Sequence, residues 1–293
     1  VMLRQYRLVH PRLRRERALL APQRHVYILE RLRADGAVRV SDLMRELGVS
    51  DMTVRRDLEA LEAQGHLVKV HGGATLLRES AVHEPGFDTK RTLEHEAKLA
   101  IARKAAAMVE PGMAVAVSAG STTYEVSRRL AEIPRLTIVT NSVPAAEVLY
   151  HGGRSDQTII LTGGVRTPSD ALVGPFAVSA LRTVNVDLVF LGVHGMHERA
   201  GFTTPNMLEA ETNQALIEAG ARLVVTADHT KWGVTGVSTI ARLERADVVV
   251  TDDVLGREAR TVLEDRVGLL VLTGSGENVE PLEARGSSVA VGA

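Results

Sequence analysis

The chain has 293 residues, enough for two domains of ordinary size, and 45% of them are hydrophobic. It contains no cysteine, which excludes disulfides, thiolate zinc sites and cysteine nucleophiles, and which fits a reducing cytoplasm. No apolar run approaches the roughly 18 residues that span a bilayer, and no apolar block follows the basic N-terminus, so we expect no membrane span and no secretory signal. Aromatic residues make up only 3%, which argues against a stacking platform for single-stranded nucleic acid.

The formal net charge of −1 conceals an uneven distribution of charge along the chain. Residues 1–80 hold 15 Lys and Arg against 10 Asp and Glu, whereas residues 81–293 hold 20 against 26. The two parts therefore carry net charges of +5 and −6. A basic front on an acidic body is typical of a nucleic-acid-binding head joined to a separate domain, although ordinary variation of surface charge explains it equally well.

Residues 1–21 are rich in arginine and lack apolar periodicity, so we expect a flexible basic arm. Residues 22–75 then predict a helix that ends near Asp35, a short strand, two short helices with Ser41 and Ser50 as N-caps, and a β-hairpin. Two short helices joined by a tight turn are typical of a helix-turn-helix, and the hairpin that follows makes it winged. We therefore predict a winged helix-turn-helix DNA-binding domain over 22–75.

The second short helix has the pattern of a recognition helix. Val54, Leu58 and Leu61 recur with helical spacing and face the core, which directs Arg55 and Arg56 to the flank and the opposite side. The N-terminal end of such a helix enters the major groove, where arginine can bond guanine. The alternative is a solvated helix whose arginine pair bonds Asp57 or Glu59. The residues expected to contact DNA are Ser50, Thr53, Arg55, Arg56, Lys69, His71, Gly72 and Gly73.

The remaining chain divides into a polar linker over 76–90, a second domain over 91–273 and a loose tail over 274–293. Apolar runs alternate with helical stretches in the second domain, which predicts an α/β fold with a Rossmann-like parallel sheet covered on both faces. The runs lie at 113–117, 136–139, 158–161, 187–191, 222–226, 248–250 and 269–272, and the helical stretches include 122–132, 143–150, 206–219 and 254–266.

A loop of small residues, AVSAGSTT over 116–123, follows the first of these strands and opens a helix. Free N–H groups, hydroxyl donors and the helix dipole at such a junction favour a phosphate group. The alternative is a tight turn capped by Ser and Thr. No GxxxxGK[ST] pattern occurs, so we do not expect nucleoside triphosphate hydrolysis.

Other small or polar clusters follow the later strands, and ligands bind at the carboxyl ends of strands in open α/β sheets. We expect these clusters to converge with the 116–123 loop, and Lys98 and Lys231 are candidates to neutralise a phosphate, although each lone residue fits an ordinary surface position too. The residues expected to bind an effector are Lys98, Ser118, Gly120, Ser121, Thr122, Thr123, Asn141, Gly163, Gly164, Gly192, Asp228 and Lys231.

These motifs together resemble the DeoR family of bacterial transcriptional regulators. In the head, the matching residues are the VSDMTVRRDL run over 49–58, Leu61, Gly65 and the HGGA run over 71–74. In the second domain they include Phe87, Lys90, the AGSTT loop, the TNS run over 140–142, the DLVFLGVHG run over 187–195 and the KWG run over 231–233. Lys69 stands where the family more often has Arg, and Ser118 where it usually has Asp.

The resemblance implies that Arg55, Arg56 and the wing read an operator. It also implies a sensor domain with a fold like that of ribose-5-phosphate isomerase and CoA-transferase, which binds a phosphorylated sugar or related metabolite. From this we expect a cytoplasmic homo-oligomer, a dimer or tetramer, that represses a carbohydrate-utilisation operon. We expect no catalytic residues, cofactor or metal. The alternatives are a sugar-phosphate isomerase-like enzyme with a DNA-binding head, and a constitutive DNA-binding protein whose second domain only oligomerises.

Overall fold

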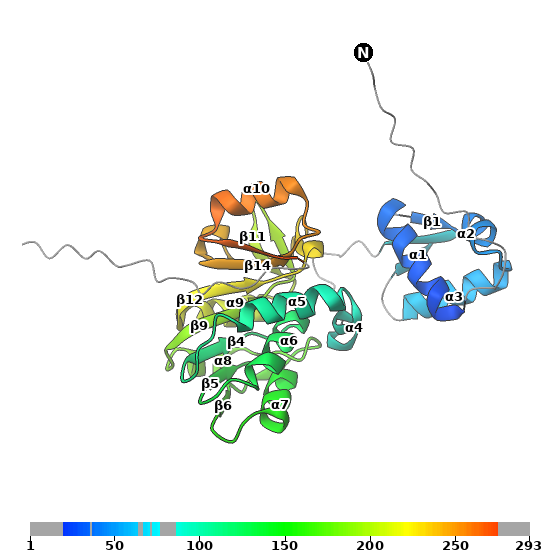
Figure 1. Cartoon of the computed structure of the whole chain (residues 1–293). Helices are drawn as coiled ribbons and strands as arrows, with labels where there is room; N and C mark the ends of the chain where they lie inside the picture. The colour runs from blue at the N-terminus through cyan, green and yellow to red at the C-terminus, as the bar shows by residue number, and fades with distance from the viewer. Residues whose placement is uncertain (1–19, 36, 64–66, 71, 77–85, 275–293) are drawn as a thin grey trace, which may run out of the picture. The chain divides into compact units, whose positions relative to one another are not determined.

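The computed structural model describes residues 20–35, 37–63, 67–70, 72–76 and 86–274. They fall in two units, Val1–Arg78 and Glu79–Ala293. Most of the predicted arm, linker and tail, together with His71, lies outside the described residues (Figure 1). The described helices include none with the length and apolar character that a bilayer span requires.

The first unit, which we call the head, combines three helices with a small antiparallel sheet (Figure 1). A turn of three residues joins the second and third helices, and β3 lies between β1 and β2 in the sheet. This arrangement confirms the predicted winged helix-turn-helix. The elements are α1 (Ala21–Asp35), β1 (Ala37–Arg39), α2 (Val40–Leu47), α3 (Asp51–Ala63), β2 (Leu67–Val70) and β3 (Gly73–Leu76).

The core of the head explains why these short elements stay together. Each of the three helices contributes fully buried aliphatic side chains, and Val54, Leu58 and Leu61 of α3 face inward as the pattern predicts. Asp57 lies in the same helix and is 4% exposed. Its carboxylate accepts hydrogen bonds from Arg24 Nε at 2.6 Å and Arg24 Nη2 at 2.9 Å, and its Oδ1 lies 3.2 Å from His25 Nε2. Asp57 therefore joins α3 to α1.

The start of α2 differs from the prediction, in which Ser41 was the N-cap. The helix begins two residues earlier, at Val40, and its N-cap residue Arg39 makes no side-chain cap. Val40 is buried in the core of the head, and its N–H donates to the carbonyl of Gly72 in the wing at 2.9 Å. A carbonyl of the wing thus accepts from one of the N–H groups at the start of α2 that have no acceptor within the helix.

The second unit is centred on a parallel sheet of seven strands in the order β15-β14-β12-β9-β4-β5-β6. All seven predicted apolar runs are strands of this sheet, with bounds that differ by at most two residues. The strands are β4 (Ala114–Val117), β5 (Thr137–Thr140), β6 (Thr158–Leu161), β9 (Val186–Gly192), β12 (Gly220–Thr226), β14 (Val248–Asp252) and β15 (Leu270–Thr273).

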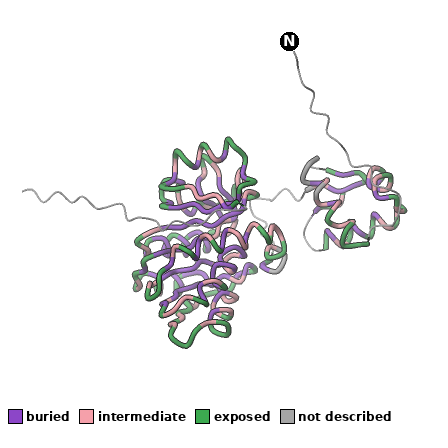
Figure 2. The backbone as a smooth tube through the Cα atoms, viewed as in Figure 1, coloured by how far each residue is buried: buried purple, intermediate pink, exposed green. Residues whose placement is uncertain are grey.

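Helices cover both faces of this sheet, and the strands between them are largely buried (Figure 2). One face packs against α5 (His95–Ala106), α6 (Ser121–Leu130) and α7 (Val143–Gly152). The other packs against α8 (Pro175–Leu181), α9 (Met207–Glu218), α10 (Arg257–Arg266) and an antiparallel sheet of β10 (Gly195–His197), β11 (Gly201–Thr204) and β13 (Ser238–Ala241). The sequence did not predict the antiparallel sheet, and α10 begins at Arg257 rather than at 254.

Four short elements and one further helix complete the second unit. They are α4 (Phe87–Thr92), β7 (Val165–Arg166), β8 (Leu172–Val173), η1 (His229–Lys231) and η2 (Leu243–Arg245). The α4 helix packs on α6, where the rings of Phe87 and Tyr124 meet edge to face at 5.5 Å and Arg91 lies 4.9 Å from the centre of the Tyr124 ring. The second unit therefore includes residues from Phe87 onward.

The strand order places a topological switch point between β4 and β9. From β4 the chain builds outward through β5 to β6, and from β9 it builds in the opposite direction through β12 and β14 to β15. The connections that leave β4 and β9 therefore diverge, which opens a crevice at the carboxyl ends of these two strands.

The Asp57 bridge generates a prediction about stability. In Asp57→Ala the guanidinium of Arg24 stays largely buried without its partner, which we expect to cost about 1–3 kcal/mol. Hydrogen exchange of the α1 and α3 amides, followed by mass spectrometry on the whole chain, should become roughly 10- to 100-fold faster. Asp42→Ala is the matched control, because its pair with Arg45 is exposed and should contribute little. Equal exchange rates in both variants would show that the bond between Asp57 and Arg24 does not stabilise the head.

Candidate functional site

The predicted recognition helix, α3, carries exposed side chains at Met52, Arg55 and Arg56 near its N-terminal end. Ser50 caps this helix, because its Oγ accepts from the Thr53 N–H at 3.3 Å and lies 2.9 Å from Thr53 Oγ1. Arg55 is held on the helix surface by Asp51, with Nε 2.6 Å from Oδ1. The alternative prediction paired Arg55 and Arg56 with Asp57 or Glu59. In the structure Asp57 instead bonds Arg24 of α1, and Glu59 bonds Lys69.

The charges of the head are balanced apart from the N-terminal segment. Residues 20–76 contain eight Lys and Arg and eight Asp and Glu, so the net +5 of the first 80 residues arises within residues 1–19. Most cations of the head with described side chains are paired with a carboxylate, whereas Arg39 and Arg56 have no such partner among the described residues. Arg56 is exposed on α3, which leaves its guanidinium available to a ligand.

The residues of the wing have structural contacts. Lys69 Nζ lies 2.8 Å from Glu59 Oε1, and the Lys69 N–H donates to Glu62 Oε1 at 2.9 Å. A Cβ at Gly73 would meet the Val38 carbonyl oxygen at 2.1 Å, so the pairing of β1 with β3 requires glycine there. Gly72 is exposed, and its carbonyl accepts from Val40.

Sequence reasoning did not single out Met52 in this surface. Met52 is 72% exposed in the first turn of α3, beside Thr53 and Arg56. An exposed apolar side chain at the end of a helix that enters a groove can contact a thymine methyl group. Met52 is surrounded by polar residues in the sequence, and nothing in that pattern indicated that its side chain is exposed.

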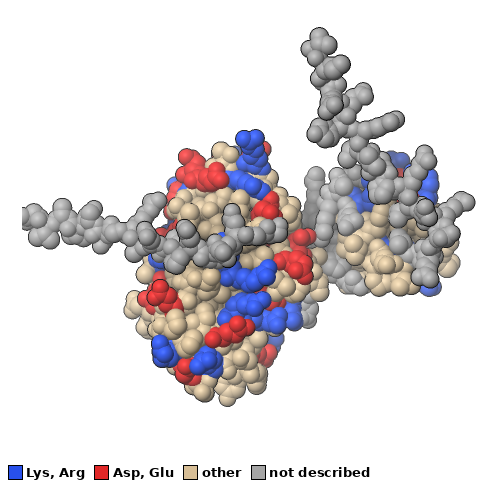
Figure 3. Space-filling model, viewed as in Figure 1, with Lys and Arg blue, Asp and Glu red and all other residues tan. Residues whose placement is uncertain are grey.

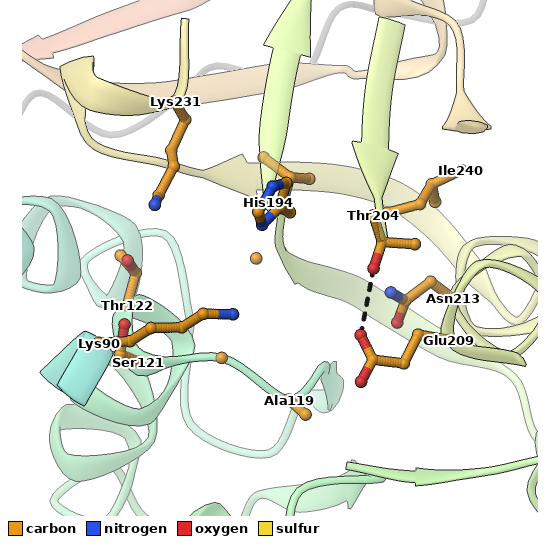
Figure 4. A pocket seen from close by; sticks show the side chains of 13 residues that line it. Lys90, Ala119, Ser121, Thr122, His194, Thr204, Glu209, Asn213, Lys231 and Ile240 are labelled. Carbon is orange, nitrogen blue, oxygen red and sulfur yellow. Dashed lines mark hydrogen bonds between the residues drawn. The ribbon is translucent and has the colours of Figure 1, made fainter. Parts of the chain in front are cut away.

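The crevice at the switch point holds a pocket (Figure 4). Figure 4 shows Ser121, Thr122 and Lys231 at one end of the pocket, with Lys90 reaching in from the same end, and Thr204, Glu209 and Asn213 at the other. The lining residues are Lys90, Ala119, Gly120, Ser121, Thr122, Gly192, Val193, His194, Thr204, Glu209, Asn213, Lys231 and Ile240.

The first end of the pocket is suited to an anion. The first N–H groups of a helix have no acceptor within the helix, and no side chain caps α6 at Gly120. Gly120 has φ 154°, a conformation that favours glycine and brings the loop close to Gly192. Lys90 and Lys231 add two positive charges to the helix dipole. Backbone donors, the dipole and two ammonium groups together form an anion-binding end.

The second end of the pocket is built by β11 and α9. The Glu209 carboxylate accepts from Thr167 Oγ1 at 3.0 Å and Thr204 Oγ1 at 3.2 Å, and also from Ser169 Oγ. Asn206 caps α9 and fixes its first turn. His194 lies between the two ends, and burial, together with Lys90 and Lys231, lowers the pKa of its imidazole to about 4.

Five of the residues predicted to bind an effector line the pocket, namely Gly120, Ser121, Thr122, Gly192 and Lys231. Three others lie behind the loop and fix its shape. Ser118 Oγ accepts from the Gly192 N–H at 2.9 Å, Asn141 Oδ1 accepts from the Ala119 N–H at 2.9 Å, and Thr123 Oγ1 donates to the Gly120 carbonyl at 3.0 Å. These bonds join the ends of β4, β5 and β9.

Lys98 and Asp228 lie behind the two pocket lysines. Lys98 is 3% exposed, and its Nζ donates to the Lys90 carbonyl at 2.6 Å and to the Leu93 carbonyl, which fixes the C-terminal end of α4. Burial lowers the pKa of the Lys98 ammonium to about 8, and Asp228 opposes that shift. Asp228 Oδ1 accepts from the Thr230 N–H at 3.1 Å and so caps η1, which carries Lys231.

The remaining two predicted residues, Gly163 and Gly164, do not line the pocket. They lie between β6 and β7, where a Cβ at Gly164 would meet the Val173 carbonyl oxygen at 2.6 Å. Close approach of β7 to β8 accounts for Gly164.

The predicted set omitted Lys90, His194, Thr204, Glu209 and Asn213. Glu209 and Asn213 did carry a signal, because they are spaced by one helical turn on a helix whose other buried positions are mostly apolar. His194 lies in the loop between β9 and β10 and lines the pocket, although it was not among the residues expected to bind an effector. The pocket wall that contains these residues includes the antiparallel sheet, which the sequence pattern did not predict.

The His194 environment predicts a pH dependence of stability. Its pKa falls from 6.5 to about 4 on folding, so the unfolded chain binds a proton that the native protein does not bind in this window. The stability of the second unit should be fully present above pH 6.5 and should decline as the pH falls toward 4. His194→Gln should reduce that decline. An imidazole resonance of His194 that titrates near pH 6.5 in an NMR titration would contradict the prediction.

Comparison with known proteins identifies both units. The DeoR-like helix-turn-helix domain matches residues 24–80, and the DeoR C terminal sensor domain matches residues 93–253, more than half of the chain. The HTH-type transcriptional regulator GlpR of Haloferax volcanii is 35% identical over 87% of this chain and 99% of its own length. The glycerol-3-phosphate regulon repressor of Escherichia coli is 31% identical over 78% of this chain and 90% of its own length.

Among solved structures, ribose 5 phosphate isomerase A from Neisseria gonorrhoeae aligns with a TM-score of 0.37 and 15% identity, covering 50% of this chain and 57% of that protein. A similarity of this size carries no inference about chemistry. The assignment therefore rests on the two sequence models and the regulators that match nearly end to end. This chain belongs to the DeoR family of transcriptional regulators.

Proposed function

We propose that this regulator represses a carbohydrate-utilisation operon and that a phosphorylated sugar or related metabolite sets its affinity for the operator. The observation that carries the proposal is the convergence of the uncapped N-terminus of α6 with Lys90 and Lys231 in one pocket. One relative is named for a regulon of a phosphorylated compound, glycerol 3-phosphate, and that name supports a phosphorylated effector here.

A phosphate monoester fits the anion-binding end better than a carboxylate does. Its three terminal oxygens can accept from the N–H groups at Ser121 and Thr122 and also from the two ammonium groups. The hydroxyls of Ser121 and Thr122 add further donors. No step of chemistry is required of these groups, and we propose that the pocket binds its ligand without turnover.

The position of Lys90 supports coupling between the pocket and the head. Lys90 belongs to α4, the first described element after the segment that joins the two units. Lys98 fixes the carbonyl end of the same short helix, and Phe87 packs it on α6. An anion that draws Lys90 toward α6 would therefore act on the segment next to the linker. Coupling of about 1–3 kcal/mol would change operator affinity roughly 5- to 150-fold.

In the head, we propose that Arg56 contacts base edges while the Ser50–Thr53 cap and Arg55 contact the backbone or a neighbouring base. Arg56 has the exposed guanidinium that a bidentate contact with guanine needs. Lys69, Gly72 and Gly73 belong to the wing, which we propose lies along the phosphate backbone, and we propose the same role for His71, which lies outside the described residues. A single head offers little contact surface, so we propose that two or more copies bind adjacent half-sites.

Arg56→Ala tests the DNA surface. Loss of a bidentate contact should weaken binding to the operator roughly 10-fold or more while leaving nonspecific binding nearly unchanged. Fluorescence anisotropy at one fixed salt concentration measures both affinities. Arg154→Ala is the control, because Arg154 is an exposed arginine of the second unit that pairs with Asp156. Unchanged operator affinity in Arg56→Ala would show that α3 does not read the DNA.

Lys231→Met tests the anion-binding end. The variant should bind inorganic phosphate and sugar phosphates roughly 10-fold or more weakly in calorimetry, because it loses a charge-assisted hydrogen bond. Operator binding without ligand should stay as in the parent protein. Lys104→Met on α5 is the matched control, since Lys104 does not line the pocket. If Lys231→Met and the parent bind phosphates equally, the anion does not lie where we propose.

A further inference from the structure

The wall opposite the lysines has a chemistry of its own. Glu209 and Asn213 lie one helical turn apart on α9, so both side chains project from one face of the helix. Both line the pocket, with exposures of 8% and 7% (Figure 4). Thr204 adds a hydroxyl to the same wall.

Asn213 is the unusual member of this wall. Its carboxamide makes no hydrogen bond with any other residue in the described part of the chain, although the residue is more than nine-tenths buried. Buried side-chain amides are nearly always hydrogen-bonded, because an unsatisfied polar group in a protein interior is costly. The Asn213 amide opens on the pocket, so a ligand bound there can supply the hydrogen-bond partner that the described residues do not.

The chemistry of the wall indicates which groups it takes. An ionised Glu209 only accepts hydrogen bonds, and it already accepts from the hydroxyls of Thr167, Ser169 and Thr204. Asn213 both donates and accepts. A ligand hydroxyl can donate to Glu209 as Thr204 does and can exchange a hydrogen bond with Asn213. A second anionic group at this end would be repelled by Glu209, and an alkyl end would leave Asn213 unsatisfied.

We propose that Glu209 and Asn213 are specificity-determining residues that read hydroxyl groups at the end of the effector remote from its phosphate. The site then takes a singly phosphorylated polyhydroxy compound and discriminates against an alkyl phosphate, a bisphosphate or a phosphorylated acid of the same length. This inference rests on the proposed function, because it presupposes that Lys90, Lys231 and α6 hold the phosphate.

The test compares matched probes by calorimetry on the whole chain. The probes are inorganic phosphate, polyol phosphates of three to six carbons, the alkyl phosphates of the same lengths, and phosphorylated acids such as 6-phosphogluconate. We expect at least one polyol phosphate to bind 10-fold or more tightly than its alkyl counterpart and than the acid of its length. A site with buried polar groups rejects analogues that lack the hydroxyl in this way.

Asn213→Leu removes the amide and keeps the side-chain volume. Because Asn213 makes no hydrogen bond in the described structure, thermal stability should be retained, while the preference for polyol over alkyl phosphates should fall to about twofold or less. Gln214→Leu is the matched control on the same helix, since Gln214 is exposed and bonds the Thr239 carbonyl outside the pocket lining. Glu209→Gln, checked for folding by thermal shift, should abolish the discrimination against phosphorylated acids.

The outcomes separate this inference from the proposed function. If inorganic phosphate and alkyl phosphates bind but no polyol phosphate binds more tightly, the hydroxyl-reading wall is wrong while the phosphate end survives. A polyol preference that persists in both Asn213→Leu and Glu209→Gln also overturns it. If no phosphorylated probe binds the parent protein, the phosphate end fails and the inference fails with it.

Discussion

The pocket of the second unit is built around one feature, which is the uncapped first turn of α6 at the carboxyl end of β4. Gly120 provides no side-chain cap, so the first N–H groups of α6 have no acceptor from a cap residue. The loop takes its shape from neighbouring strands, because Ser118 Oγ accepts from the Gly192 N–H at the end of β9 and Asn141 Oδ1, just after β5, accepts from the Ala119 N–H. These bonds hold the loop from behind, and Ser121 and Thr122 in the first turn of α6 face the pocket.

The same feature orders the charged groups around the loop. Lys90 and Lys231 each belong to a short element that a buried residue fixes, α4 by Lys98 and η1 by Asp228. The two elements are about 140 residues apart in the chain, and the fold brings both to the N-terminus of α6. The pocket thus has a positive end, to which α4 and η1 contribute Lys90 and Lys231. Its other end is a polar wall from β11 and α9.

Much of this could be predicted from the sequence, and the limits have physical reasons. The seven strands of the parallel sheet are nearly continuous apolar runs, so the sequence predicted them. Val54, Leu58 and Leu61 recur with helical spacing, so the core face of α3 was predicted too. The antiparallel sheet was missed because β10, β11 and β13 are three or four residues long and contain glycine, threonine and serine. Without that sheet, Glu209 and Asn213 could not be placed opposite the loop. Lys98 was predicted to bind the effector, but it is buried behind the pocket. The sequence around a lysine does not show whether its side chain is buried.

In the head, the apparent charge asymmetry gave less information than the placement of individual charges. The net positive charge of the first 80 residues lies in residues 1–19, and the described head is neutral. On the face of the second unit drawn in Figure 3, basic and acidic residues are interspersed, without a large field of one sign. In the described head, Arg24, Arg55 and Lys69 are paired with carboxylates, whereas Arg56 is exposed and has no such partner.

The most direct test of the central claim is the affinity of the protein for the DNA upstream of its own gene, measured by fluorescence anisotropy while sugar phosphates are titrated at fixed salt. If the pocket controls the head, one phosphorylated compound shifts the binding curve at least 5-fold and its unphosphorylated parent does not. An operator affinity that no phosphorylated compound changes, although the same compounds bind the protein, would contradict the claim that the pocket controls the head.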